Sequence, residues 1–149
     1  MKKIILKDII KAIAQELKYL LPKVKIYDEG IEQGYKEPCF FIDYTKENIK
    51  KMIGNRYNNE TKFRAIYFQD FKEEDARYKV YKVRDTLNEG FDYIDYKGLH
   101  FRIKNKEIEI QGKDLHFSFE IQFFTKKATE EIPKLSNIEK ITEKEKNDA

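Results

Sequence analysis

One stretch, "LHFSFEIQFF" at residues 115–124, constrains the fold more than any other part of the sequence. Its apolar side chains alternate with polar ones, and four of them share one face: Phe117, Phe119, Ile121 and Phe123. Alternation with a period of two predicts a β-strand that buries one face. Such a strand needs neighbouring strands and a second layer of structure against its apolar face.

Two stretches carry the spacing of amphipathic helices, which would supply that layer. Residues 6–21 place apolar side chains three and four positions apart, at Leu6, Ile9, Ile10, Ile13, Leu17, Leu20 and Leu21. Asp8 favours the start of this helix, and Pro22 predicts that it ends near Leu21. A second helix is predicted after residues 73–75, ending near Gly90. Its buried stripe consists of Ala76, Val80, Val83 and Leu87.

Strands are predicted between the two helices. Residues 24–28 alternate as a short strand, and residues 38–46 and 61–69 are typical of longer ones. Residues 49–57 are ambiguous. We interpret residues 50–57 as the first arm of a hairpin whose turn lies at Asn58-Asn59.

Three more strands are predicted after the second helix, at residues 99–105, 107–112 and 115–124. The turns between them are expected at Asn105-Lys106 and at Gly112-Lys113.

The resulting order is helix, three strands, helix, three strands (αβββαβββ). Two helices cannot cover both faces of about six strands, so both are expected to pack on one face. We therefore predict an α+β fold with a mixed or antiparallel sheet, whose other face meets water or a neighbour. Residues 1–125 form a single domain in this interpretation.

Residues 126–149 differ in composition from the rest of the chain. They contain six lysines and six acidic residues. Their apolar side chains recur three positions apart, at Ile132, Leu135, Ile138 and Ile141. This segment alone buries too little apolar surface to offset its ordering entropy. We predict a charged C-terminal tail that is mobile or docked on a partner.

Composition narrows the function classes. The net charge of +3 comes from 30 basic and 27 acidic residues, which is a mixed surface and not that of a dedicated nucleic-acid binder. The single cysteine excludes an internal disulfide and a Cys-rich zinc site. No run approaches the ~20 apolar residues of a membrane span. The apolar start "MKKIIL" is interrupted at Lys7, so no signal peptide is expected.

The residues that could carry chemistry are few. Cys39 begins a strand after Pro38 with no histidine linked to it, and we interpret it as a core residue rather than a nucleophile. His100 and His116 would be neighbours if their strands pair, yet they lack the spacing of a metal site.

Asp92 and Asp95 either bind a cation or lie in a solvated loop. No triad context and no phosphate-binding glycine motif is present. We expect no catalytic, cofactor-binding or metal-binding residue, and no enzyme.

A non-enzymatic interaction protein remains, with a nucleic-acid-binding module as the alternative. The basic residues of that alternative surround the predicted hairpin: Lys46, Lys50, Lys51, Arg56, Lys62 and Arg64. A lysine-rich strand edge that resists aggregation has the same composition. Open strand edges also invite pairing with a neighbour, and a ring of identical subunits would cover them.

The stretch "GIEQGYKEPCFFI" at residues 30–42 resembles the signature of a phage tail terminator family found in phages and phage-like particles of Gram-positive bacteria. The matching positions are Ile31, Gln33, Gly34, Tyr35, Pro38, Cys39, Phe40, Phe41 and Ile42. Further likeness lies in Arg56-Tyr57 and in residues 63–68, 115–124 and 133–139. Residues 46–62 otherwise match nothing in the family, and neither do the last eight residues.

The resemblance implies a small α+β structural protein of a tail-terminator-like fold. Such proteins form a hexameric ring at the head-proximal end of a tail, stop growth of the tube and, in contractile tails, engage the sheath. The implied partners are further copies of the chain and the tube and sheath proteins, with DNA only passing through the ring. No membrane partner is expected.

The implied location is the bacterial cytoplasm during assembly, and then the tail of a virion or of a bacteriocin-like particle. Within this framework we predict assembly contacts in the 29–37 loop, the hairpin and the tail. The predicted residues are Gln33, Tyr35, Lys50, Lys51, Arg56, Tyr57, Ile132, Leu135 and Ile138.

Overall fold

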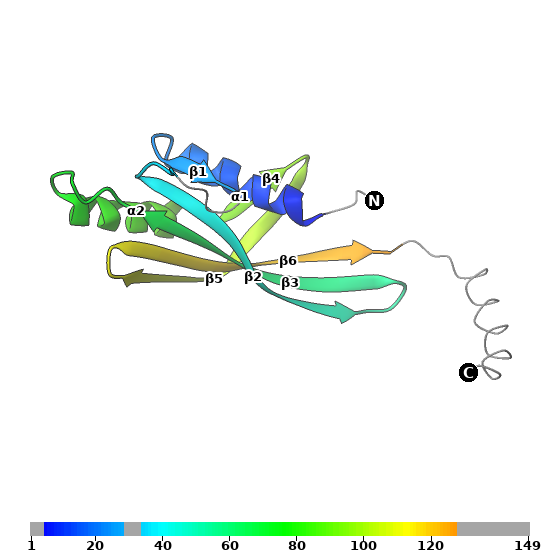
Figure 1. Ribbon diagram of the computed structural model, residues 1–149. Helices are drawn as coiled ribbons and strands as arrows, with labels where there is room; N and C mark the ends of the chain where they lie inside the picture. The colour runs from blue at the N-terminus through cyan, green and yellow to red at the C-terminus, as the bar shows by residue number, and fades with distance from the viewer. Residues whose placement is uncertain (1–4, 29–33, 128–149) are drawn as a thin grey trace, which may run out of the picture.

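The computed structural model describes residues 5–28 and 34–127 of the chain (Figure 1). Two helices and six strands follow one another in the predicted αβββαβββ order. Their bounds are α1 (Leu6–Leu20), β1 (Lys25–Tyr27), β2 (Cys39–Lys51), β3 (Arg56–Phe68), α2 (Ala76–Gly90), β4 (Tyr93–Tyr96), β5 (Leu99–Gln111) and β6 (Asp114–Lys126).

The strands form one six-stranded sheet in the order β1-β2-β3-β6-β5-β4. β1 runs parallel to β2, and all other neighbours are antiparallel, so the sheet is mixed. The two short edge strands, β1 and β4, both contact α1. The sheet therefore curls around this helix, and the predicted α+β class is confirmed.

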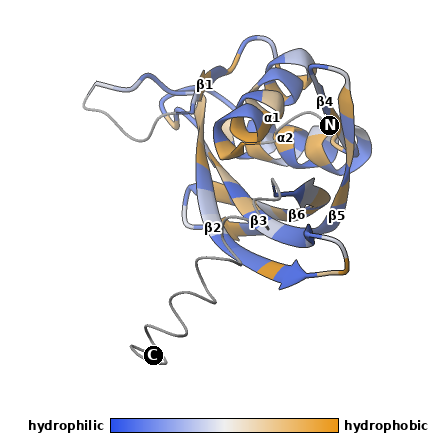
Figure 2. Cartoon of the chain, turned by 90° about the vertical axis from the view of Figure 1, so that its right-hand side faces the viewer, coloured by the Kyte–Doolittle hydropathy of each residue, from blue (hydrophilic) through white to orange (hydrophobic). Residues whose placement is uncertain are grey.

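Both helices cover the same face of the sheet. One core cluster contains the apolar stripes of α1 and α2 together with the inward side chains of the strands. Ile13, Leu87 and Phe119 in this cluster have no exposed surface. Figure 2 shows the hydrophobic colouring concentrated between the helices and the sheet. Burial of this apolar surface, at about 25 cal/mol per Å², supplies the main stabilisation of the fold.

The ends of the two helices meet near Gly90. A Cβ atom at this position would lie 2.9 Å from the Leu20 side chain, so glycine permits the close approach. The Lys106 Nζ donates to the carbonyl oxygens of Leu87 and Asn88, at 3.3 and 3.1 Å. These carbonyls lie in the last turn of α2, where helix geometry leaves them without an internal partner.

The turn of the first hairpin differs from the prediction. Asn58 and Asn59 lie inside β3, and the chain turns at Gly54 and Asn55, whose φ angles are +75° and +61°. The Met52 N–H donates to the Arg56 carbonyl oxygen at 2.7 Å and closes the turn. Consecutive positive φ angles match the twist of a hairpin, and glycine adopts them without strain.

The second half of the chain needs a similar correction. Asn105-Lys106 is not a turn, because β5 continues through it with an irregularity between Lys104 and Glu107. An extra residue bulges out of a strand without ending it. The two strands predicted at residues 99–105 and 107–112 are thus the single strand β5. The half still has three strands because β4, which contains Asp95 and was not predicted, precedes β5. The turn at Gly112-Lys113 is confirmed.

The sheet extends beyond the helical layer. β2, β3, β5 and β6 each have 13 residues, or roughly 43 Å at 3.3 Å per residue, whereas each 15-residue helix spans roughly 22 Å. Figure 1 shows the β2–β3 hairpin and the end of β6 continuing past the helices. We call residues 46–62 the β2–β3 arm. Neither helix in the described ranges has the length and apolar character to cross a membrane.

Candidate assembly surface

Four of the nine predicted contact residues meet at the end of the β2–β3 arm. Lys51 lies opposite Tyr57, and Lys50 precedes it on the same strand. Arg56 begins β3 and lies opposite Lys126 at the end of β6. Lys50, Lys51, Arg56 and Lys126 are all exposed. The hairpin and the neighbouring strand thus gather positive charge at one end of the sheet.

Two of the positively charged side chains at this end of the sheet lie over aromatic rings. The Arg56 guanidinium lies 5.6 Å from the centre of the Phe124 ring, and the Lys127 Nζ lies 4.5 Å from the centre of the Tyr57 ring. A cation over a ring face at these distances is attracted by about 0.5–1 kcal/mol at an exposed site. The contacts orient the positive charges without neutralising them.

The tip of the arm also carries exposed apolar side chains, which the sequence reasoning missed. Ile53 is 93% exposed and Ile49 is 57% exposed, with Met52 between them. Figure 2 shows hydrophobic colouring at this end of an otherwise hydrophilic hairpin. Clustered exposed apolar groups mark interaction sites. The missed signal is the Gly54-Asn55 pair, which is typical of a hairpin turn and places Ile53 at the tip.

Polar side chains on the inner face of the arm are held by internal hydrogen bonds. The Asn59 Nδ2, in a side chain that is buried, donates to the Phe123 carbonyl oxygen at 3.3 Å and to the Thr125 Oγ1 at 3.0 Å. The Thr61 Oγ1 donates to the Glu47 Oε2 at 3.0 Å. The Asn59 bonds link the arm to β6 and the Thr61 bond joins the two strands of the arm, so its tip is presented by an ordered support.

Tyr35 lies at the opposite end of β3 from the arm's tip. Its ring contacts Phe41 at 5.2 Å and Phe68 at 5.7 Å between ring centres, and Phe41 stacks on Tyr27. Desolvation, with a smaller contribution from Glu37, raises the pKa of the Tyr35 hydroxyl. The remaining predicted contacts lie outside the described residues: Gln33, Ile132, Leu135 and Ile138.

Cys39 has no exposed surface. Desolvation by burial, with a smaller contribution from the Glu37 carboxylate, raises the pKa of its thiol to about 11. A nucleophilic cysteine needs the opposite shift, because the thiolate is the reactive form. The environment of Cys39 is that of a core residue.

The two histidines are not neighbours, contrary to the expectation from their strands. His100 lies 2.5 Å from the Asp95 carboxylate, and its ring stacks on Tyr93. In the register of β5 and β6, the residue opposite His116 is Glu109 and not His100. Within residues 5–28 and 34–127, no group of three or more histidine, cysteine or acidic side chains has the arrangement of a metal site.

Several cations of the predicted basic patch have carboxylate partners. Arg64 donates to Asp43 at 2.9 Å, and Lys62 lies 3.9 Å from Glu107. Asp92, a candidate cation ligand, instead accepts a hydrogen bond from the Lys106 ammonium at 2.7 Å. The outer face of the sheet therefore carries both signs of charge, and the unneutralised cations concentrate at the end of the arm.

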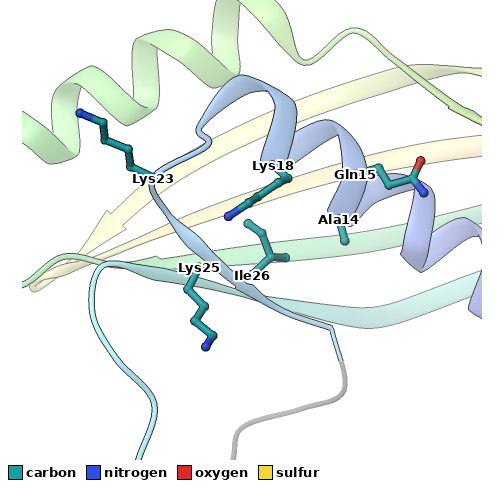
Figure 3. Close-up of a pocket in the computed structure, with 6 residues that line it drawn as sticks. All are labelled: Ala14, Gln15, Lys18, Lys23, Lys25 and Ile26. Carbon is teal, nitrogen blue, oxygen red and sulfur yellow. The ribbon is translucent and has the colours of Figure 1, made fainter.

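A shallow hollow of about 580 Å³ lies between α1 and β1 (Figure 3). Its lining consists of Ala14, Gln15, Lys18, Lys23, Lys25 and Ile26. The ammonium groups of Lys23 and Lys25 point away from each other in Figure 3. The lining contains no acidic group, so these side chains form no acid–base pair.

The comparison with protein families decides what kind of protein carries this surface. The family model described as phage tail terminator protein matches residues 8–133, from the first turn of α1 to beyond the end of β6. The chain belongs to the phage tail terminator protein family. The predicted family resemblance is thereby confirmed. No curated protein matches the sequence.

Membership in the phage tail terminator protein family indicates a structural role in a phage tail. It also implies contacts with other tail components and a location in the virion tail. The β2–β3 arm is the described feature best suited to such contacts, because it projects beyond the core and combines apolar and cationic side chains.

Proposed function

We propose that this tail terminator forms a hexameric ring that caps the head-proximal end of the tail tube. The ring stops tube growth and joins the tail to the head or collar. The role is non-enzymatic. The observation that carries the proposal is the family match over residues 8–133.

The proposal also specifies the host cell, the type of tail and the partner proteins. The chain assembles in the cytoplasm of a Gram-positive host and serves a contractile tail, of a phage or of a headless bacteriocin-like particle. Its partners are further copies of itself, the tube protein and the sheath protein. The proposal includes that the chain shares its fold with other tail terminators.

In this proposal the β2–β3 arm docks on a tail protein. Docking would remove Ile53 and its neighbour Met52 from water, and full burial of such a side chain contributes about 1.5–3 kcal/mol. Lys51 and Arg56 beside this apolar tip would select a partner surface that is acidic at its rim. The internal hydrogen bonds of the arm support this role, because an ordered tip loses less entropy on docking.

Nucleic-acid binding remains the second candidate, on one observation. Five cations gather at the end of the arm: Lys50, Lys51, Arg56, Lys126 and Lys127. Binding through phosphate contacts falls steeply with salt concentration. A titration of duplex DNA at two salt concentrations tests this candidate, and undetectable binding at low salt would eliminate it.

A single substitution at the tip tests the docking role. A strain that lacks the gene is complemented with the Ile53→Glu variant, which should fold normally and fail to restore tails of uniform length. The matched control is Tyr19→Glu on α1, where the side chain is 79% exposed and distant in sequence from the arm. Normal tails with Ile53→Glu would contradict the role of the tip.

A further inference from the structure

Two long strands of the sheet each leave one edge without a strand partner among the described residues. β1 pairs only with residues 39–41 of β2, and β4 pairs only with residues 99–102 of β5. The rest of both edges carries backbone N–H and C=O groups that a further strand can satisfy. The two free edges belong to opposite sides of the sheet, because β2 lies next to β1 and β5 lies next to β4.

Each free edge has a regular segment of similar length. The register of β2 shifts between Tyr44 and Lys46, and that of β5 shifts between Lys104 and Glu107. Beyond these irregularities, residues 46–51 of β2 and residues 107–111 of β5 continue in regular register. Strand addition therefore has five to six residues available on each side.

The side chains of the two segments are complementary on both faces of the sheet. On the outer face, β2 presents Lys46 and Lys50, whereas β5 presents Glu107 and Glu109. Glu107 is 70% exposed despite its long contact with Lys62, so its carboxylate is accessible. On the inner face, β2 presents Ile49, which is exposed, and β5 presents Ile110, which is 40% exposed, and Ile108, which is partly buried.

A hollow lies beside the two isoleucines of β5. It has a volume of about 500 Å³ and lies between α2 and the free edge of β5. Its lining includes Tyr81 and Arg84 of α2 and the inner-face residues Ile108 and Ile110 of β5. A strand added to this edge would place an inner-face side chain against Ile108 and Ile110. Ile49 of β2, 57% exposed, supplies an apolar side chain at that position.

We propose that the free edge of β2 in one copy of the chain pairs with the free edge of β5 in the next copy, which continues the sheet from subunit to subunit. In one copy β2 and β5 point in opposite directions, so a continued sheet with the helices of both copies on the same face pairs these two edges antiparallel. The lysine row then lies beside the glutamate row, and Ile49 contacts Ile108 or Ile110. This contact deepens the proposed function and rests on it for its place in a ring.

Pairing of like edges is disfavoured by charge. Two β2 edges would bring Lys46 and Lys50 of one copy beside the same lysines of the other. Two β5 edges would bring Glu107 and Glu109 beside their own copies, and like charges on facing strands are destabilising. The head-to-tail contact leaves one edge of each kind open at the ends of any oligomer, so it propagates until a ring closes.

Cysteine cross-linking of the full-length chain tests the geometry. The Ile49→Cys/Ile110→Cys double variant, oxidised during assembly, should give a ladder of covalent oligomers. The single variants Ile49→Cys and Ile110→Cys should give none, because the proposed contact joins unlike edges. Cys39 is buried and is present in every variant as an internal control. Dimers from a single variant, or no ladder from the double variant, would overturn the proposal.

Charge reversal tests the energetics on the same chain. The association constant for self-assembly of Lys46→Glu/Lys50→Glu should fall about tenfold, and adding Glu107→Lys/Glu109→Lys should restore it. Folding of each variant is checked by its unfolding free energy. If the second pair of reversals weakened assembly further, the pairing of these rows would be wrong. If tail length still depended on the presence of the chain but the double cysteine variant gave no covalent ladder, the proposed function would stand and only this contact would be wrong.

Discussion

Phe117 illustrates how single residues hold this fold together. Its side chain has no exposed surface and contacts the rings of Phe91 and Phe119 at 5.3 and 5.1 Å between ring centres. It thus joins β6 to the segment that follows α2. Removing such a ring leaves a cavity that the neighbouring aromatic rings cannot fill by small shifts.

The Phe117→Ala variant should therefore lose about 3–5 kcal/mol of unfolding free energy, as measured by urea denaturation. The matched control is Phe124→Ala on the same strand, where the ring is 40% exposed. Its loss should be about 1 kcal/mol or less. Equal losses in the two variants would contradict the assignment of the core face of β6.

Cys39 gives a prediction for the pH dependence of stability. The pKa of its thiol is about 11 in the folded chain and 9.0 as a reference for the unfolded chain. Below about pH 9 the thiol is protonated in both states, and its contribution to stability is fully present. Between these values the unfolded chain ionises first, so the unfolding free energy falls as the pH rises.

The test compares the original chain with Cys39→Ala at about pH 7.5 and about pH 10. The stability of the original chain should fall more between these conditions than that of the variant. Burial raises the pKa of Tyr67 to about 12, and the Cys39 thiolate adds a smaller part of this shift, which the substitution removes together with the thiol. Parallel losses would mean that the thiol is ionised as easily in the folded chain as in the unfolded one.

At the scale of elements, the β2–β3 arm depends on a buried amide. Asn59→Ala would leave the Phe123 carbonyl and the Thr125 hydroxyl without the donor they share. We expect a loss of about 1–3 kcal/mol in unfolding free energy, with faster hydrogen exchange in the arm. The control is Asn48→Ala on the exposed side of β2, which should change stability by about 0.5 kcal/mol or less.

The elements that the sequence predicted well are those with several independent signals. The α1 stripe is reinforced by Pro22, and the α2 stripe by Gly90, so both helices lie where they were expected. The arm had two competing turn signals, Gly54-Asn55 and Asn58-Asn59, only four positions apart. Local propensity does not distinguish them. The position of the turn is set by the pairing of Asn59 with Phe123 of β6, which is a long-range interaction.

The candidate site was predictable to a similar degree. Lys50, Lys51, Arg56 and Tyr57 were predicted as contacts, but they meet because the chain turns at Gly54-Asn55. The predicted turn at Asn58-Asn59 would have placed all four on one arm, with Lys50 and Tyr57 at its two ends. The exposure of Ile53 depends on the position of the turn, so the wrong turn concealed the apolar tip. The opposite charges on the free edges of β2 and β5 were also hidden, because sheet order and register follow from tertiary pairing and not from local pattern.

At the scale of the whole molecule, the described structure is a curled sheet with both helices inside the curl and strands that extend beyond them. This shape leaves two surfaces for assembly: the tip of the β2–β3 arm and the two open strand edges. The family match gives these surfaces a biological setting, in which one chain must contact both its own copies and other tail proteins.

The central claim is that the chain terminates tail growth, and electron microscopy of the parent particle tests it most directly. Particles are compared with and without the gene, and after complementation with the original sequence. The account predicts tubes of uncontrolled length in the absence of the chain and uniform tails when it is restored. Tails of normal, uniform length in particles that lack the chain would contradict the account.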